Sequence, residues 1–286
     1  MIAVEEEYPL AGLTLRGKRW HKGAPHKVLA LHGWLDNCAS FDRLLPLLPD
    51  FEVLALDLAG QGLSDFRPGL GAYNIWQDCS ELYQLQRVLG WPKCVLLGHS
   101  RGAMIASLYA GSFPENVSAL CLIDAVLPLT CSAEEAPQQL ATAIRGLVDG
   151  RGQSQRYYAT RDLALNAREK ALFPLAREAC AVLADRSLLQ NEQGYYWRYD
   201  SRLLMASEFR MSREQALAFV DRYPCPALLL ASFGADDREH PLFAAHDKLR
   251  HVKVAGSHHL HLDNNDLTLA KLAETISNYV CEQHAA

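Results

Sequence analysis

The sequence predicts an α/β fold in which a mostly parallel sheet has helices on both faces and a helical subdomain is inserted after the sixth strand. Short, continuous apolar runs alternate with helical stretches along the 286 residues, which is typical of strands buried on both faces. This alternation stops after residue 126 and resumes after residue 223. The sequence therefore predicts a core of residues 1–126 and 224–286 and an inserted subdomain of residues 127–223.

The strands are predicted from their apolar character. Residues 8–20 alternate loosely and predict a hairpin with a turn near Gly12 or Gly17. Continuous apolar runs then predict six further strands, over residues 28–32, 53–57, 94–97, 119–123, 227–231 and 252–254.

The helices follow from periodic apolar positions and their start signals. In the core we expect helices over residues 41–48, 75–89, 101–113 and 265–281. In the insertion we expect helices over residues 134–148, 160–172, 174–183 and 212–220. The last of these opens with Ser212, a residue type that caps helix N-termini, before Arg213 and Glu214.

Composition excludes several functional classes. The net charge is −5, with no block of basic residues, so we expect no nucleic-acid partner. The first seven residues are acidic rather than basic and apolar, and no apolar run approaches the roughly 20 residues of a membrane span. We therefore expect a soluble cytoplasmic protein with no membrane span, and the sequence makes no prediction of its oligomeric state.

The pentapeptide Gly98-His99-Ser100-Arg101-Gly102 carries the strongest chemical signal. It joins an apolar run to a helical run, which is the setting of the G-x-S-x-G nucleophile elbow. The sharp turn projects the serine hydroxyl outward, and side chains two residues to either side would collide with the turn. Ser100 is therefore predicted to be a nucleophile at the start of a helix.

Four motifs in order along the chain resemble the α/β-hydrolase superfamily. They are the His32-Gly33-Trp34 turn, the run Asp57-Leu58-Ala59-Gly60-Gln61-Gly62-Leu63-Ser64-Asp65, the elbow, and Gly256-Ser257-His258. Residues 31–41 (LHGWLDNCASF) look most like the serine hydrolase-like proteins. The resemblance implies an α/β-hydrolase fold whose inserted helices form a cap over the active site.

The resemblance also implies the base that activates the serine. A neutral serine needs a group that takes its proton near pH 7, and histidine suits this role. Of His258, His259 and His261, the superfamily pattern G-x-H selects His258, and the other two are interpreted as packing or hydrogen-bonding neighbours. His32 and His99 are interpreted as structural residues.

The acid that orients the base has two main candidates. Many relatives carry it after the strand at residues 227–231, but that loop matches only if an insertion brings Asp236 or Asp237 into place. Other relatives carry it at the tip of the preceding strand, where this chain has Asp124 followed by Pro128. We slightly favour Asp124, with Asp237 as the better loop candidate.

The remaining parts of the site are implied by the same resemblance. The oxyanion hole would be formed by the backbone N–H groups of Trp34 and Arg101, and the Arg101 side chain could serve an ion pair or a substrate anchor. The eight cysteines include no CxxC pair, and no zinc motif accompanies the histidine cluster. We therefore expect no metal and no cofactor.

These residues predict a serine hydrolase that acts on a small-molecule ester. A carboxylesterase with a Ser-His-Asp triad and an acyl-enzyme accounts for all the motifs. Hydrolysis of a carbon–carbon bond in a dienoate-type substrate would use the same triad. A binding protein on an inactive hydrolase fold is the third hypothesis, because the sequence does not single out the acid.

Overall fold

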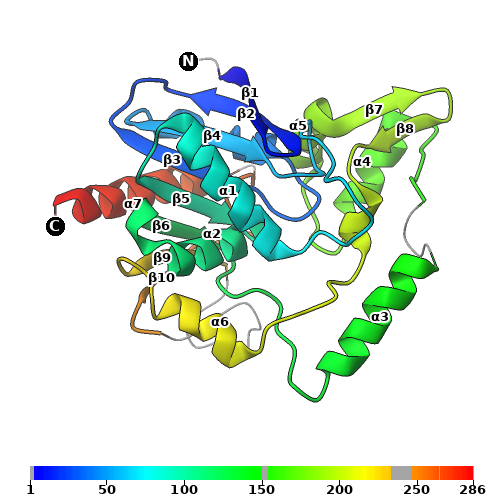
Figure 1. Cartoon of the computed structure of the whole chain (residues 1–286). Helices are drawn as coiled ribbons and strands as arrows, with labels where there is room; N and C mark the ends of the chain where they lie inside the picture. Colours follow the sequence, from blue (N-terminus) through cyan, green and yellow to red (C-terminus); the bar gives the residue numbers. More distant parts are fainter. Residues whose placement is uncertain (1–2, 150–153, 233–245, 264, 286) are drawn as a thin grey trace.

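The structure is a computed structural model that describes residues 3–149, 154–232, 246–263 and 265–285. It is built around an eight-stranded sheet (Figure 1). The strands of this sheet are β1 (Val4–Leu10), β2 (Leu13–Trp20), β3 (His26–Leu31), β4 (Phe51–Asp57), β5 (Cys94–His99), β6 (Val117–Ile123), β9 (Ala227–Ala231) and β10 (Leu249–Lys253).

The sheet has the order β1-β2-β4-β3-β5-β6-β9-β10. The pairs from β4 to β10 are all parallel, whereas β2 runs antiparallel to both β1 and β4. The mostly parallel α/β fold predicted from the sequence is thus confirmed. The hairpin turn falls at Gly12, which has a φ of 93°, whereas Gly17 pairs with Leu56 inside the sheet.

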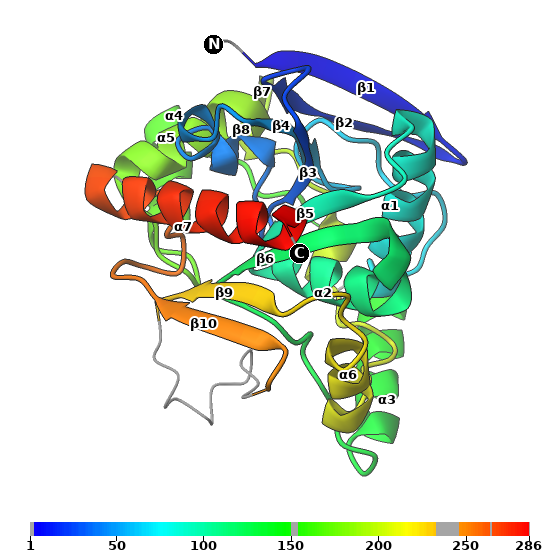
Figure 2. The same ribbon diagram turned by 90° about the vertical axis from the view of Figure 1, so that its left-hand side faces the viewer.

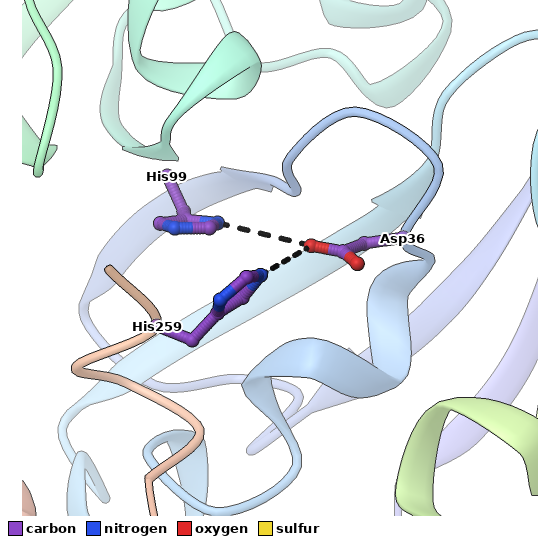
Figure 3. A group of neighbouring side chains, drawn as sticks. All are labelled: Asp36, His99 and His259. Atoms are coloured by element: carbon purple, nitrogen blue, oxygen red, sulfur yellow. Dashed lines mark hydrogen bonds and ion pairs between the residues drawn. The ribbon is translucent and has the colours of Figure 1, made fainter. Parts of the chain in front are cut away.

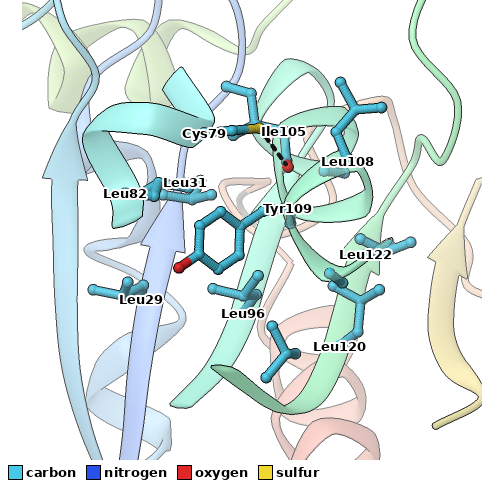
Figure 4. Packing of buried hydrophobic residues seen from close by; sticks show 14 of the residues in the cluster. Leu29, Leu31, Cys79, Leu82, Leu96, Ile105, Leu108, Tyr109, Leu120 and Leu122 are labelled. Atoms are coloured by element: carbon cyan, nitrogen blue, oxygen red, sulfur yellow. Dashed lines mark hydrogen bonds between the residues drawn. The ribbon is translucent and has the colours of Figure 1, made fainter. Parts of the chain in front are cut away.

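Two hydrophobic cores cover the two faces of the sheet. Because successive side chains of a strand point to opposite faces, Leu29 and Leu31 of β3 pack on one face and Val28 and Ala30 on the other. The first core lies under α1 (Ile75–Leu89) and α2 (Arg101–Ser112), where Tyr109 is fully buried (Figure 4). The second core lies under α7 (Asp266–Ala285), on the opposite side of the sheet (Figure 2).

The helix predicted over residues 41–48 is wrong. The chain instead forms two short 3₁₀ helices, η1 (Cys38–Phe41) and η2 (Leu45–Leu47). Pro46 and Pro49 account for the difference, because proline lacks the N–H of an α-helical hydrogen bond and its ring crowds the preceding turn. Leu44, Leu45 and Leu48 of this segment nevertheless pack into the core beneath α7.

Most of the regular secondary structure described in the insertion after β6 is helical. The insertion contains α3 (Ala136–Val148), α4 (Arg161–Glu169), α5 (Arg177–Ser187) and α6 (Arg213–Val220), with a 3₁₀ turn η4 (Ser201–Leu204). Ser212 caps α6 by accepting a hydrogen bond from the Gln215 N–H, as the sequence predicts. Its helix packs on α2 and buries Ala216 and Val220.

The insertion also contains a hairpin that we did not predict. Strands β7 (Leu188–Asn191) and β8 (Gly194–Trp197) pair antiparallel. Gly194, with a φ of 121°, follows the turn between them. The aromatic run Tyr195-Tyr196-Trp197 favours a strand, because aromatic residues are enriched in strands.

Arg186 of α5 ties the insertion to the core. Its Nε donates to both carboxylate oxygens of Asp57, at 3.0 and 2.8 Å, and its terminal nitrogens donate to Glu5. The side chains of Arg186 and Asp57 are 5% and 0% exposed. Asp57 also accepts the backbone N–H groups of Cys38 and Leu63. The pair therefore joins α5 to the end of β4 and is almost completely shielded from water.

Replacing Arg186 with methionine is expected to lower the free energy of unfolding by about 3–5 kcal/mol, because the carboxylate of Asp57 would stay buried without its partner. The matched control is Arg161→Met, which breaks an exposed ion pair to Asp185 and should cost less than about 1 kcal/mol. Urea unfolding of both variants measures the difference. Equal losses would contradict a central role for the Arg186–Asp57 pair.

One further result bears on the class of protein. No helix in the part of the chain that the structure describes is both long enough and apolar enough to cross a bilayer.

Candidate active site

Ser100 occupies the sharp turn between β5 and α2. Its φ of 50° and ψ of −117° are unusual for a non-glycine residue, and its N–H donates to the Ile123 carbonyl at 2.9 Å. A Cβ on Gly98 would lie 2.6 Å from the Ala103 Cα, and one on Gly102 would overlap the Leu31 carbonyl. Both glycines are thus required for α2 to pack closely against the strands, and the tight turn places Ser100 at the C-terminal edge of the sheet.

His258 lies beside Ser100, in the loop between β10 and α7. Its Nε2 is 2.9 Å from the Ser100 Oγ, and its Nδ1 is 2.6 Å from the Asp124 Oδ2. The ring of Phe173 stacks on the imidazole with ring centroids 4.1 Å apart. Serine, histidine and carboxylate thus form one hydrogen-bonded row, although they lie far apart in the sequence.

Asp124 follows the last residue of β6 and adopts a φ of 56°, a conformation that aspartate tolerates better than most residues. Its N–H donates to the Leu230 carbonyl at 2.9 Å. Its Oδ1 accepts hydrogen bonds from both the N–H and the Oγ of Ser232, at 2.7 and 2.8 Å. Asp124 therefore has one oxygen held by Ser232 and the other directed at His258. The rival candidates Asp236 and Asp237 lie outside the described residues.

The neighbouring histidines are buried structural groups. His99 donates from Nε2 to the His258 carbonyl at 2.9 Å, and the His259 Nε2 lies 3.3 Å from the Asp36 Oδ2. Burial and the neighbouring histidines hold the pKa values of His99 and His261 well below the ordinary value, so both rings are neutral.

Asp36 and Arg168 are two residues of this region that the sequence did not single out. The Arg168 guanidinium of α4 donates to the Asp36 Oδ1 at 2.7 Å and to the Phe173 carbonyl at 3.2 Å. Burial alone would raise the pKa of Asp36, but Arg168 and His259 hold it well below its ordinary value, so this carboxylate is ionised. No local motif marks either residue, because their partners come from distant segments.

The two backbone amides that the sequence predicts for an oxyanion hole belong to Trp34 and Arg101, of which Trp34 lines the cavity beside Ser100. Trp34 follows the His32-Gly33 turn and Arg101 begins α2, and neither N–H donates a hydrogen bond to another residue within the described chain. The Trp34 indole donates to the Leu203 carbonyl at 3.0 Å. The Arg101 side chain forms a buried ion pair with Asp78 of α1 at 2.8 Å. This side chain therefore has a structural role.

A cavity of about 90 Å³ opens beside Ser100. It is lined by Gly33, Trp34, Leu35, Asp36, His99, Ser100, Arg168, Ala171, Leu172, Phe173, His258 and His259. A larger groove of about 740 Å³ lies elsewhere, between the N-terminal hairpin and α5, and is lined mostly by charged residues such as Arg16, Lys18 and Asp42. Because Ser100 and His258 line only the smaller cavity, the smaller one is the candidate active site.

His32, which directly follows β3, is held in its neutral form by its hydrogen bonds. Its Nδ1–H donates to the Gly33 carbonyl at 2.7 Å, and its Nε2 accepts the Leu58 N–H at 3.0 Å. A second proton on Nε2 would face the Leu58 N–H. Burial accordingly lowers the pKa of His32.

Acid is therefore expected to destabilise the fold through His32. Below about pH 6.5 the His32 ring takes up a proton in the unfolded chain but not in the folded chain. The free energy of unfolding therefore decreases as the pH is lowered, by at most about 1.4 kcal/mol per pH unit. Urea unfolding between pH 7.5 and 5 would show a shallower pH dependence for His32→Gln than for the parent protein. An identical pH dependence would contradict this account.

Comparisons with known proteins show the family to which this chain belongs. A family model described as the alpha/beta hydrolase fold matches residues 27–238. A probable serine hydrolase from Drosophila melanogaster is 30% identical over 272 residues, which cover 88% of this chain and 81% of the relative. Serine hydrolase-like protein 2 from Homo sapiens is 32% identical over 218 residues, which cover 74% of this chain and 66% of the relative.

Solved structures show the same similarity. A hypothetical protein from Pseudomonas aeruginosa PAO1 is 33% identical, with a TM-score of 0.91 over 97% of this chain and 99% of that one. The thioesterase domain from the curacin biosynthetic pathway is 24% identical, with a TM-score of 0.81 over 97% of this chain and 100% of that one. The chain therefore belongs to the α/β-hydrolase family, as a serine hydrolase-like member.

Proposed function

We propose that this protein is a carboxylesterase that cleaves small carboxylic esters through an acyl-enzyme on Ser100. The observation that carries the proposal is the row Ser100–His258–Asp124, with contacts of 2.9 and 2.6 Å, at the wall of a cavity. A serine in hydrogen-bond contact with an imidazole, which is itself oriented by a carboxylate, is the arrangement that activates a hydroxyl nucleophile.

Each group has one role in the proposed reaction. The Ser100 Oγ attacks the ester carbonyl while the His258 Nε2 takes its proton, and Asp124 keeps the ring N–H on Nδ1. The amides of Trp34 and Arg101 stabilise the oxyanion, each by about 3 kcal/mol. His258 then gives its proton to the departing alcohol. Water attacks the acyl-enzyme by the same route and releases the acid.

The insertion, residues 127–223, is proposed to act as a cap that selects the acyl group. Ala171, Leu172 and Phe173, between α4 and α5, line the cavity, and Phe173 covers His258. At about 90 Å³ this cavity is small, since pockets that enclose drug-sized ligands measure about 300–1,000 Å³. The site as it stands therefore suits an acyl group of about two to four carbons, with the alcohol directed outward.

A panel of p-nitrophenyl esters of graded acyl length, run beside a dienoate substrate, tests the proposal. We expect the highest kcat/KM for acetyl to butyryl esters and labelling of Ser100 by a fluorophosphonate. A preference for long acyl chains would contradict the small acyl site. Cleavage of the dienoate alone would instead assign carbon–carbon bond hydrolysis, and absence of labelling and turnover would leave a binding protein on a hydrolase fold.

The cap residues provide a matched pair of variants. Leu172 and Leu163 are both exposed leucines, but only Leu172 lines the cavity, so Leu172→Ala changes the cavity wall and Leu163→Ala, in α4, does not. The first should shift the preferred acyl length upward and the second should leave it unchanged. The same shift in both variants would contradict a cap that selects by direct contact.

A further inference from the structure

Asp36, His99 and His259 converge beneath the candidate active site (Figure 3). The Asp36 Oδ2 lies 3.3 Å from the His259 Nε2 and 4.0 Å from the His99 Nδ1. One ligand atom from each residue lies within 4.8 Å of the other two, and all three residues are buried. They come from the loop after β3, from the end of β5 and from the loop after β10, so only the fold brings them together.

His99 presents a lone pair to this group. Its Nε2 carries the proton that is donated to the His258 carbonyl, so in the neutral ring Nδ1 is a bare acceptor. This Nδ1 has no hydrogen-bond partner among the described residues, and the Asp36 Oδ2, which lies 4.0 Å from it, is another acceptor. Two buried acceptors that face each other are unfavourable unless a donor or a cation lies between them.

We propose that Asp36, His99 and His259 bind a divalent transition-metal ion such as Zn²⁺. Two imidazole nitrogens and one carboxylate oxygen are a common ligand set for this ion, with water in the fourth position. The hydrogen bond from the His99 Nε2 to a backbone carbonyl is the kind of outer contact that orients a ligating imidazole. All three residues line the cavity beside Ser100, which gives the ion access from solvent.

Arg168 limits the strength of this site. Its guanidinium lies 2.7 Å from the Asp36 Oδ1 and supplies a positive charge beside the incoming cation. It also keeps Asp36 ionised, so no proton has to leave the carboxylate when a metal binds. The site is therefore one of moderate affinity that an exchangeable ion would occupy according to its concentration.

Metal binding would act on the neighbouring nucleophile through short connections. His259 directly follows His258, and Asp36 lies two residues after Trp34. His99 directly precedes Ser100 and donates a hydrogen bond to the His258 carbonyl. Two ligand atoms at about 2.0–2.2 Å from a tetrahedral ion lie about 3.4 Å apart, so the His99 Nδ1, which is 4.0 Å from the Asp36 Oδ2, has to move toward the ion. A displacement of about 1 Å near a catalytic centre can cost on the order of 10² in rate. Zn²⁺ is therefore an inhibitor of Ser100 at this site.

The direct test is equilibrium binding of Zn²⁺ to the metal-free protein by isothermal titration calorimetry, with Co²⁺ absorption as a probe of nitrogen and oxygen ligands. We expect one ion per chain. His259→Gln and His99→Gln should each weaken binding at least about tenfold, since losing even an outer contact of a metal ligand costs 10–100-fold. Arg168→Met should strengthen binding. Thermal unfolding in EDTA checks that each variant is folded.

His261→Gln is the matched control, because His261 is buried against His99, with ring centroids 4.2 Å apart, but contributes no ligand atom to the group. It should bind Zn²⁺ as the parent does. The rate of fluorophosphonate labelling of Ser100 should fall at least tenfold with bound Zn²⁺ in the parent and the control, and recover in EDTA. Parent-like Zn²⁺ binding by both His259→Gln and His99→Gln would overturn the proposed metal site, and so would equal weakening of binding by His261→Gln. Either outcome is independent of whether the protein hydrolyses esters.

Discussion

Replacing Ser100 with alanine is expected to lower kcat for ester hydrolysis by a factor on the order of 10⁶, the loss seen when a serine protease loses its nucleophile. Without the Oγ no acyl-enzyme forms, and the base has no hydroxyl to activate. The fold should be preserved, because the glycines around the elbow, rather than the serine hydroxyl, allow the close packing there. Steady-state kinetics, fluorophosphonate labelling and thermal unfolding measure these three effects.

Ser112 provides the control for this experiment. It is at the other end of α2, and its Oγ donates to the Leu108 carbonyl within the helix. Ser112→Ala should keep the kcat and the labelling of the parent. If Ser100→Ala retained near-parent activity, the proposed reaction would be wrong, and a loss of only a few-fold would indicate another nucleophile.

Replacing Asp124 with asparagine is expected to lower kcat by about 10⁴, as the same change does in a serine protease. Ser232 gives the physical reason. Its N–H and Oγ both donate to one oxygen of Asp124, so the oxygen of an asparagine would stay there and its NH₂ would turn to His258. The NH₂ would donate to the His258 Nδ1 and force the ring proton onto Nε2. The ring could then no longer accept the serine proton.

Two further variants make this test decisive. Ser232→Ala removes only one of the two hydrogen bonds to the Asp124 Oδ1 and should cost far less than Asp124→Asn. Asp237→Asn should also cost far less. A large loss in Asp237→Asn with little change in Asp124→Asn would place the orienting acid in the later loop. If both variants kept nearly full activity, Asp236 would be the remaining candidate in this region.

The sheet and the elbow could be predicted because their signals are local. A strand buried on both faces is typically a continuous apolar run, and β4, with all seven residues buried, contains such a run at residues 53–56. Ser100 was predictable because the two glycines and the following helix stand within a few residues of it. Pro46 is also a local signal, because proline disfavours an α-helix, and it counts against the helix predicted over residues 41–48.

The rest depended on contacts between distant segments. The sequence left the acid open between Asp124 and a loop that matched only with an insertion, because no local pattern says which carboxylate meets His258. Asp36 and His259 are 223 residues apart, so no spacing rule could pair them. The hairpin of β7 and β8 carries a local signal in its aromatic run, but the strands have only four residues each, too few for a clear alternating pattern.

The wall of the cavity has a consequence for how this protein could diverge. The row Ser100–His258–Asp124 is formed by residues that follow strands β5, β10 and β6 of the sheet. By contrast, Leu172 and Phe173, which line the cavity, belong to a segment of the insertion. Substitutions in that segment alter the shape of the cavity without touching the sheet edge that holds the serine. After gene duplication, a few substitutions in this segment of the insertion can therefore change the substrate, while purifying selection retains the residues at the sheet edge and with them the chemistry.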